Sequence, residues 1–299
     1  MYYRVLHKTI YHYSEPVTLC QNLSHLTPRD LPDQYCWRTQ LEIRPEPALR
    51  FTYGDYFGNR ATFCTVQEPH RDLSMIATHY VEVAPRLPTA LTTSVTWEAV
   101  RDRLRADRSR ESLAAYQFAF ASRYVQPSAK LAAYAEQSFA AGASLYDGVL
   151  DLTTRIHEDF SYDPQATTVS TPLDEVFAKR RGVCQDFAHL EIACLRSLGL
   201  AARYVSGYLR TVPPPGKEAL VGADATHAWL SVYDPVNGWI DVDPTNNKVV
   251  SDEHILLAWG RDYDDVNPIK GVIHGGGQHT MDLSVDVACL PELPNPLYA

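Results

Sequence analysis

Apolar and polar residues alternate along several segments of the first third of the chain, at 2–13, 38–44, 60–66 and 75–83. A period of two is typical of β-strands with one buried face. Clusters of Pro, Gly, Asp and Asn separate these segments, as in an antiparallel sheet with short turns. We therefore expect residues 1–98 to form a β-rich, sandwich-like accessory domain.

The pattern becomes helical between residues 99 and 160. Ala, Leu, Glu, Gln and Arg dominate there, and 109–122, 128–140 and 146–160 have helical composition. Five Arg and two Asp fall within 101–110, which favours a solvated, charge-rich helix face or linker over a basic patch for an acidic ligand. We expect 99–160 to lead into a core formed by 161–299, with an alternating C-terminal strand.

A helix is predicted to begin near Cys184 and to stop before Gly199. Its apolar residues recur at spacings of three, four and seven and so form one buried stripe. Cys184 then lies at the helix N-terminus, where unpaired N–H groups and the helix dipole favour a thiolate and can hold an oxyanion. His189 lies about 140° around the helix from Cys184 and is expected to be structural, like Asp186 in the first turn.

Two segments further on, 226–233 and 239–243, are predicted to form a β-hairpin around Asp-Pro-Val-Asn-Gly. If Tyr233 pairs with Trp239, then His227, Trp229, Asp241 and Asp243 lie on one face. Asp243 becomes a diagonal neighbour of His227, at roughly 7–8 Å between backbones. A thiol, an imidazole and a carboxylate in this order are the parts of a nucleophile, a base and an orienting group.

Four stretches of sequence, 181–188, 200–208, 227–229 and 238–245, resemble the bacterial transglutaminase-like superfamily. The β-rich start resembles the N-terminal region that accompanies this core in bacteria. The resemblance implies an α+β fold in which a papain-like core, with the cysteine-bearing helix packed on an antiparallel sheet, follows the sandwich-like domain. It assigns Cys184 as nucleophile, His227 as base and Asp243 as orienting group. Asp243 is preferred to Asp241 because it directly precedes Pro-Thr.

The resemblance also implies an oxyanion hole made by the Cys184 amide and a second donor upstream. Tyr162 is our candidate for that donor, and a strand aromatic packed on the core is the alternative. Trp229 is a candidate wall of the cleft, and a core tryptophan is the alternative. Residues 261–265 either border the cleft or form a salt-bridged corner.

No metal or organic cofactor is expected. His274 and His279 bracket three glycines and would need His254 or Asp262 to complete a metal site, but no recognised zinc spacing occurs.

Composition and charge narrow the class of protein. A length of 299 residues suggests about two domains, and 45% hydrophobic with 21% charged residues is ordinary for a globular protein. Lys plus Arg is 27 against 36 for Asp plus Glu, a net charge of −9, which argues against a nucleic-acid binder or a binder of anionic membranes.

We expect no targeting segment and no membrane span. Six cysteines without a CxxC pair favour a reduced, cytoplasmic protein, with an oxidised structure as the alternative.

These features predict a cysteine-dependent hydrolase of a peptide, isopeptide or glutamine-type amide bond, acting through a thioester on a peptide or protein substrate. Amine transfer, as in a transglutaminase, is one alternative. A non-catalytic peptide-binding or assembly role is the other. The sequence leaves the oligomeric state open.

Overall fold

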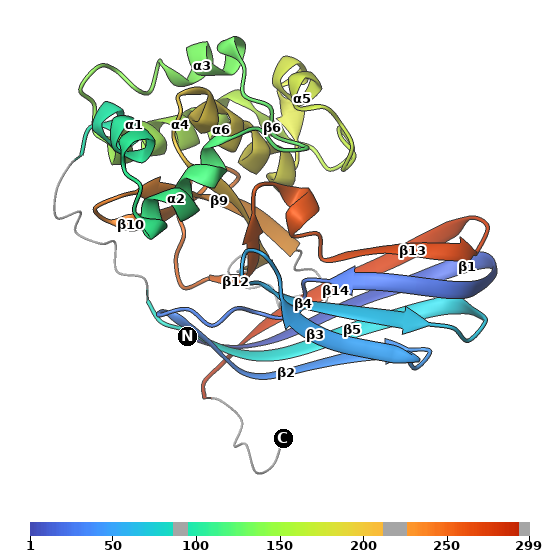
Figure 1. Cartoon of the computed structure of the whole chain (residues 1–299). Coiled ribbons are helices and arrows are strands. Elements are labelled where there is room, and N and C mark those ends of the chain that lie inside the picture. Colours follow the sequence, from blue (N-terminus) through green and yellow to red (C-terminus); the bar gives the residue numbers. More distant parts are fainter. Residues whose placement is uncertain (86–94, 212–225, 293–299) are drawn as a thin grey trace, which may run out of the picture.

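One long strand, β1 (Tyr2–Ser24), organises the first of the two large sheets (Figure 1) in the computed structural model, which describes residues 1–85, 95–211 and 226–292. Its first half pairs with β5 (His70–Val83) and β14 (His279–Leu290), and its second half pairs with β4 (Arg60–Val66) and β13 (Ile269–Gly275). The outer strands are β2 (Gln34–Arg44), next to β5, and β3 (Leu49–Gly54), next to β4.

The two halves of this sheet pack against each other. Val17 and Cys20 of β1, Cys64 of β4, and Leu73 and Met75 of β5 belong to one buried cluster. Since β4 pairs with the second half of β1, and Leu73 and Met75 of β5 pair with its first half, this shared cluster means that the two halves of the sheet face each other. The β-rich, sandwich-like character expected for the N-terminal region is confirmed.

The C-terminal strands differ from our expectation. We assigned 161–299 to the core, but β13 and β14 pair with β1 and so belong to the first sheet. Val285 and Val287 of β14 are buried, and pairing supplies hydrogen-bond partners to a strand edge of β1 that would otherwise be open. Alternation identifies a strand but not its partner. The boundaries at 98 and 160 stay a prediction.

Helices fill the middle of the chain, as the composition predicts. Side-chain oxygens of Thr96, Ser109, Ser128 and Ser144 accept hydrogen bonds from the first turns of four of them. The arginine-rich run 101–110 is largely exposed, which agrees with the solvated helix face. No helix in the described ranges is long and apolar enough to cross a membrane. The helices are α1 (Trp97–Ala106), α2 (Arg110–Tyr116), η1 (Gln117–Ala119), α3 (Ala129–Ala135), α4 (Leu145–Asp159), α5 (Leu173–Lys179), α6 (Cys184–Ser197) and η2 (Tyr263–Asp265).

The second large sheet carries the helices on one side (Figure 1). Its strand order is β11-β10-β9-β8-β12, and all of its pairs are antiparallel. Helix α6 packs on β8 and β9 and is buried along most of its length, so the expected α+β core is present. The strands are β8 (Ala202–Leu209), β9 (Thr226–Asp234), β10 (Gly238–Asp243), β11 (Lys248–Val249) and β12 (His254–Gly260), and a separate parallel pair joins β6 (Ser161–Tyr162) to β7 (Arg181–Gly182).

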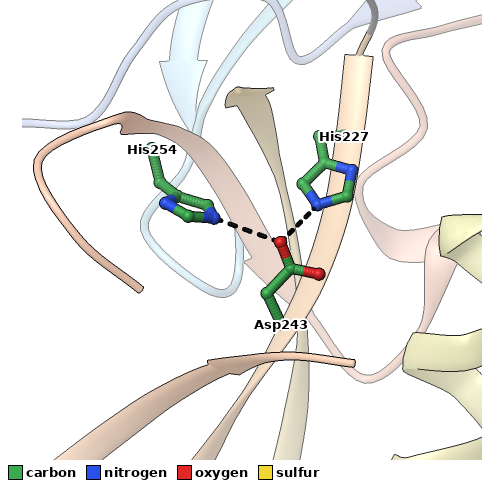
Figure 2. A group of neighbouring side chains, drawn as sticks. All are labelled: His227, Asp243 and His254. Carbon is green, nitrogen blue, oxygen red and sulfur yellow. Dashed lines mark hydrogen bonds and ion pairs between the residues drawn. The ribbon is translucent and has the colours of Figure 1, made fainter. Parts of the chain in front are cut away.

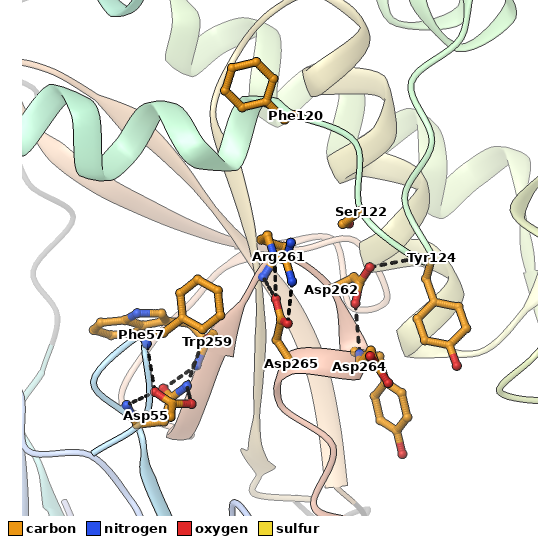
Figure 3. Close-up of polar contacts among 12 residues, drawn as sticks. Asp55, Phe57, Phe120, Ser122, Tyr124, Trp259, Arg261, Asp262, Asp264 and Asp265 are labelled. Atoms are coloured by element: carbon orange, nitrogen blue, oxygen red, sulfur yellow. Dashed lines mark hydrogen bonds and ion pairs between the residues drawn. The ribbon is translucent and has the colours of Figure 1, made fainter. Parts of the chain in front are cut away.

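Polar contacts join the two sheets near the end of β12 (Figure 3). The Asn59 side chain accepts a hydrogen bond from the Trp259 N–H and donates one to the Trp259 carbonyl.

Arg261 pairs with both carboxylate oxygens of Asp265, and Asp262 accepts from the Tyr124 N–H. Residues 261–265 therefore form a salt-bridged corner.

Candidate active site

Cys184 is the first residue of α6, and the turn before it is tightly held. The Asp186 carboxylate accepts hydrogen bonds from the Val183 N–H at 2.9 Å and the Thr167 hydroxyl at 2.6 Å. Gly182 allows this approach, because a Cβ atom there would lie 2.7 Å from Asp186 Oδ2. The structural role expected for Asp186 is confirmed, and it leaves the half-buried Cys184 at the helix end.

Tyr162 reaches the same place through the short β6–β7 pair, in which it lies opposite Gly182. Its side chain is 57% exposed and contacts the Phe187 ring edge-on, at 6.5 Å between centroids. Burial of its hydroxyl, followed by the nearby Cys184 sulfur, raises the pKa of Tyr162. The structure thus places Tyr162 beside Cys184, while its role as an oxyanion donor stays a prediction.

His227 and Asp243 meet on the hairpin in the predicted register. Tyr233 pairs with Trp239, and the pairing runs on to Leu230 opposite Val242. His227 Nε2 lies 2.8 Å from Asp243 Oδ2 (Figure 2). Cys184 lines the same pocket as His227, and its side chain is close enough to raise the pKa of the imidazole. Because Asp243 occupies Nε2, the Nδ1 atom is the nitrogen left for the sulfur.

The charges of this group support one another. Burial disfavours a charged imidazole, but the hydrogen bonds and charges of Asp243 and Cys184 outweigh it and raise the pKa of His227 to about 10. Burial also disfavours a charged Asp243, but its hydrogen bonds from His227, His254 and Asn246 hold its pKa far below the usual range. The arrangement therefore favours an imidazolium between a carboxylate and the sulfur.

Asp243 is fully buried and accepts five hydrogen bonds. Oδ1 accepts from the backbone N–H groups of Thr245 and Asn246, at 3.0 and 3.2 Å. Oδ2 accepts from Asn246 Nδ2 at 2.7 Å and His254 Nε2 at 3.2 Å, besides His227. Asn246 could have been found from the Asp-Pro-Thr-Asn turn, in which an Asp side chain binds its own turn. His254 has no such local signal.

A pocket of about 350 Å³ opens at this group. Its described lining contains no carboxylate and no cation other than His227. The lining residues are Tyr162, Cys184, Leu209, Thr211, Thr226, His227, Thr245 and Asn246.

Trp229 is not a wall of this pocket, which corrects that candidate. It is 0% exposed and packs with Val205, Val250 and Leu256. Gly207 on the neighbouring strand explains the burial, because a Cβ atom there would lie 2.3 Å from the Trp229 ring. Trp229 is the core tryptophan of the alternative interpretation.

Three other histidines, His189, His274 and His279, make contacts outside this group. His189 is buried, stacks on Tyr124 and accepts from the Tyr263 N–H, so its structural role is confirmed. His274 contacts Thr18, whereas His279 lies against the tyrosines of β1.

In the described part of the chain, one group of three side chains has the atoms and spacing to hold a metal ion, namely His227, Asp243 and His254. Their separations of 2.8 and 3.2 Å are those of direct hydrogen bonds, which account for all three positions. Neither His274 nor His279 belongs to this group.

A thiol at a helix N-terminus, facing a His–Asp pair on an antiparallel sheet, is the arrangement of the cysteine-nucleophile α+β folds. The profile of the bacterial transglutaminase-like N-terminal region matches residues 3–82, and that of the transglutaminase-like superfamily matches residues 132–244. The chain belongs to the transglutaminase-like superfamily.

Relatives and one solved structure extend this result. Uncharacterized proteins from Mycobacterium tuberculosis and Mycobacterium leprae are 42% and 31% identical, covering 95% and 96% of this chain and 92% and 98% of their own. A protein-glutamine gamma-glutamyltransferase from Pseudomonas aeruginosa is 38% identical over 92 residues, 30% of this chain and 14% of that protein. A candidate cysteine protease from Cytophaga hutchinsonii shares the fold with a TM-score of 0.74 at 22% identity, covering 98% of this chain and 93% of its own.

Proposed function

We propose that this protein is a cysteine hydrolase that cleaves a peptide, isopeptide or glutamine-type amide bond through a thioester on Cys184. The observation that carries the proposal is that Cys184 and His227 line one pocket, with His227 hydrogen-bonded to Asp243 at 2.8 Å. Membership of the transglutaminase-like superfamily supports it.

The proposed reaction assigns one step to each side chain. Cys184 Sγ attacks the amide carbonyl, and the oxyanion is held by N–H groups at the start of α6. His227 gives its proton to the leaving amine as the C–N bond breaks, and the thioester remains. His227 then takes a proton from water, whose oxygen attacks the thioester and releases the acid. Asp243 keeps the imidazole oriented and stabilises its charge throughout.

Water is the acceptor in the proposed hydrolysis, and a primary amine takes its place in the alternative reaction. Both acceptors would attack the same Cys184 thioester, so the products distinguish them.

A product assay tests this assignment. The protein is incubated with glutamine-containing and isopeptide-linked peptides, with and without excess primary amine, and the products are identified by mass spectrometry. Free acid in both arms, absent with Cys184→Ala, is the expected result. Amine incorporated in place of free acid would contradict hydrolysis.

Amine transfer is the second candidate. The observation that favours it is the local similarity to a protein-glutamine gamma-glutamyltransferase, which falls on a segment of 92 residues. The same assay separates the two reactions. A Cys184→Ser protein that kept its full biological effect would favour the non-catalytic binding or assembly role over both.

The cytoplasmic location expected from the cysteine pattern is part of the proposal, because a thiol nucleophile must stay reduced. All six cysteines are unpaired in the structure, which supports it.

A further inference from the structure

We propose that His254 is a positioning residue of the active site, which holds the Asp243 carboxylate toward His227. The inference rests on the proposed function, because it assigns a role to a side chain that acts through Asp243. His254 begins β12, and it is separated from the hairpin strand of Asp243 by two intervening strands. Its ring nevertheless meets the same carboxylate oxygen as His227 (Figure 2).

The hydrogen bonds of His254 fix which of its nitrogens carries the proton. Its Nδ1 accepts from the Ser251 N–H at 3.4 Å, and so this nitrogen has no hydrogen. The proton of the neutral ring is therefore on Nε2, which donates to Asp243 Oδ2 at 3.2 Å. Burial opposes a charge on the ring and lowers its pKa. His254 is thus a neutral donor and does not compete with His227 for a proton.

Packing holds the ring in place. His254 is 0% exposed, and Trp229 contacts it edge-on at 5.2 Å between centroids. Trp229 can lie over β8 only because Gly207 has no side chain. The fully buried tryptophan, which we first considered as a pocket wall, therefore supports the histidine behind the site.

Charged groups around the pair are few among the described residues. On the hairpin, His227 faces Asp243. The positive charge of Lys248 on β11 contributes to the lowered pKa of His254, but Lys248 also pairs with Glu253 at 3.1 Å. From α6, the Cys184 side chain contributes to the raised pKa of His227. Glu191 of the same helix is close enough to Asp243 for two negative charges to repel each other. His254 is the buried neutral donor on the side of Asp243 away from the pocket.

Without the His254 donor, the Asp243 carboxylate loses one of the hydrogen bonds that fix its orientation. The positive charge of His227 then no longer has a carboxylate held in a fixed position beside it. The imidazolium beside Cys184 then becomes less stable, and the sulfur becomes a weaker nucleophile at neutral pH. The role predicts a change in the pH dependence of Cys184 reactivity, which simple loss of packing would not produce.

The test measures the rate of alkylation of Cys184 by iodoacetamide between about pH 5 and 10, with each cysteine followed by peptide mapping. Exposed Cys289 is the reference thiol in the same molecule. The variants are His254→Phe, which removes the donor, and His254→Gln, whose amide can still donate. His79→Phe is the matched control, because His79 is equally buried but lies in the first sheet.

We expect His254→Phe to slow Cys184 alkylation near neutral pH by about tenfold or more, the equivalent of one pKa unit, and to move the profile to higher pH. His254→Gln should stay within about threefold of the wild type, and His79→Phe should leave the profile unchanged. A wild-type profile in folded His254→Phe overturns the inference alone, as does an equal loss in the Phe and Gln variants. If Cys184 of the wild type reacts no faster than Cys289, both the inference and the proposed function fall.

Discussion

At the scale of single residues, the choice between Asp243 and Asp241 is the sharpest test of the site. Asp243 accepts from His227, whereas Asp241 accepts from the Ser231 hydroxyl on the same hairpin. Asp243→Asn removes the charge that supports the imidazolium, and we expect kcat/KM to fall by about 10³–10⁴-fold, as in other triads.

Asp241→Asn is the control for this substitution, being on the same strand and face. It should change kcat/KM by less than about threefold. Equal losses in the two variants, measured on folded protein with one peptide substrate, would contradict the assignment of Asp243.

The sequence predicted the residues whose positions depend on local structure. Cys184 was placed by a helix start, and His227 and Asp243 by the register of a short hairpin. His254 could not be placed this way, because its position depends on β12 joining the far edge of the sheet. For Trp229 the sequence leaves a pocket wall and a core tryptophan both open, because alternation shows which face it shares, but not that Gly207 leaves room for its ring.

At the scale of elements, the nucleophile helix α6 contains a buried acid. Glu191 is 0% exposed, and its Oε1 lies 2.8 Å from the Thr153 hydroxyl, which also lies 2.8 Å from the Val149 carbonyl. The single Thr153 hydroxyl hydrogen is shared between these two acceptors, so it stabilises a charged Glu191 only weakly. Burial, partly offset by the Thr153 contact, raises the pKa of Glu191 to about 8.

This raised pKa predicts a pH-dependent stability. The folded protein holds the Glu191 proton more tightly than the unfolded chain does, so the contribution is full below about pH 4.5 and is lost as the pH rises to about 8. We expect Glu191→Gln to be more stable than the wild type above pH 8, by on the order of a few kcal/mol. Urea unfolding across this pH range measures the difference. Exposed Glu158→Gln is the control, and parallel curves for the wild type and Glu191→Gln would contradict the prediction.

The contact of β8 with β12 gives a second prediction for an element. A Cβ atom at Gly207 would lie 2.2 Å from the Ile255 carbonyl oxygen and 2.3 Å from the Trp229 ring. We expect Gly207→Ala to lower the free energy of unfolding by about 1–3 kcal/mol, because the core must shift. Gly54→Ala, with nothing within 4 Å of the added atom, should cost less than about 0.5 kcal/mol. The free energies of unfolding are measured by chemical denaturation. Similar losses in Gly207→Ala and Gly54→Ala would contradict the prediction.

At the scale of the whole molecule, the two sheets are joined by buried polar contacts. His7 of β1 bonds to the Tyr208 hydroxyl of β8 at 3.0 Å, and Asn59 bonds to both backbone groups of Trp259. Asn59→Ala leaves the two Trp259 groups unpaired, at a cost of about 1–3 kcal/mol each. In thermal unfolding we expect Asn59→Ala to show one transition, at a lower temperature than the wild type. The same transition should be seen by far-UV circular dichroism and by tryptophan fluorescence. Two separate transitions in the wild type would contradict this coupling.

The arrangement of the whole chain was the least predictable from sequence. The pattern identified the long alternating strands and the helices α2, α3, α4 and α6, because periodicity is local, but it missed β3, β12, β13 and α5. It did not show that β13 and β14 return to β1, since pairing over about 270 positions has no local signal. The predicted C-terminal strand was therefore placed with the core, whereas it belongs to the first sheet.

The most direct test of the central claim is a map of cysteine labelling by an electrophilic peptide probe. We predict that the label is confined to Cys184 and that it is strongly reduced in folded His227→Ala. Labelling spread evenly over the six cysteines, or undiminished Cys184 labelling without the imidazole, would contradict an activated nucleophile at the start of α6.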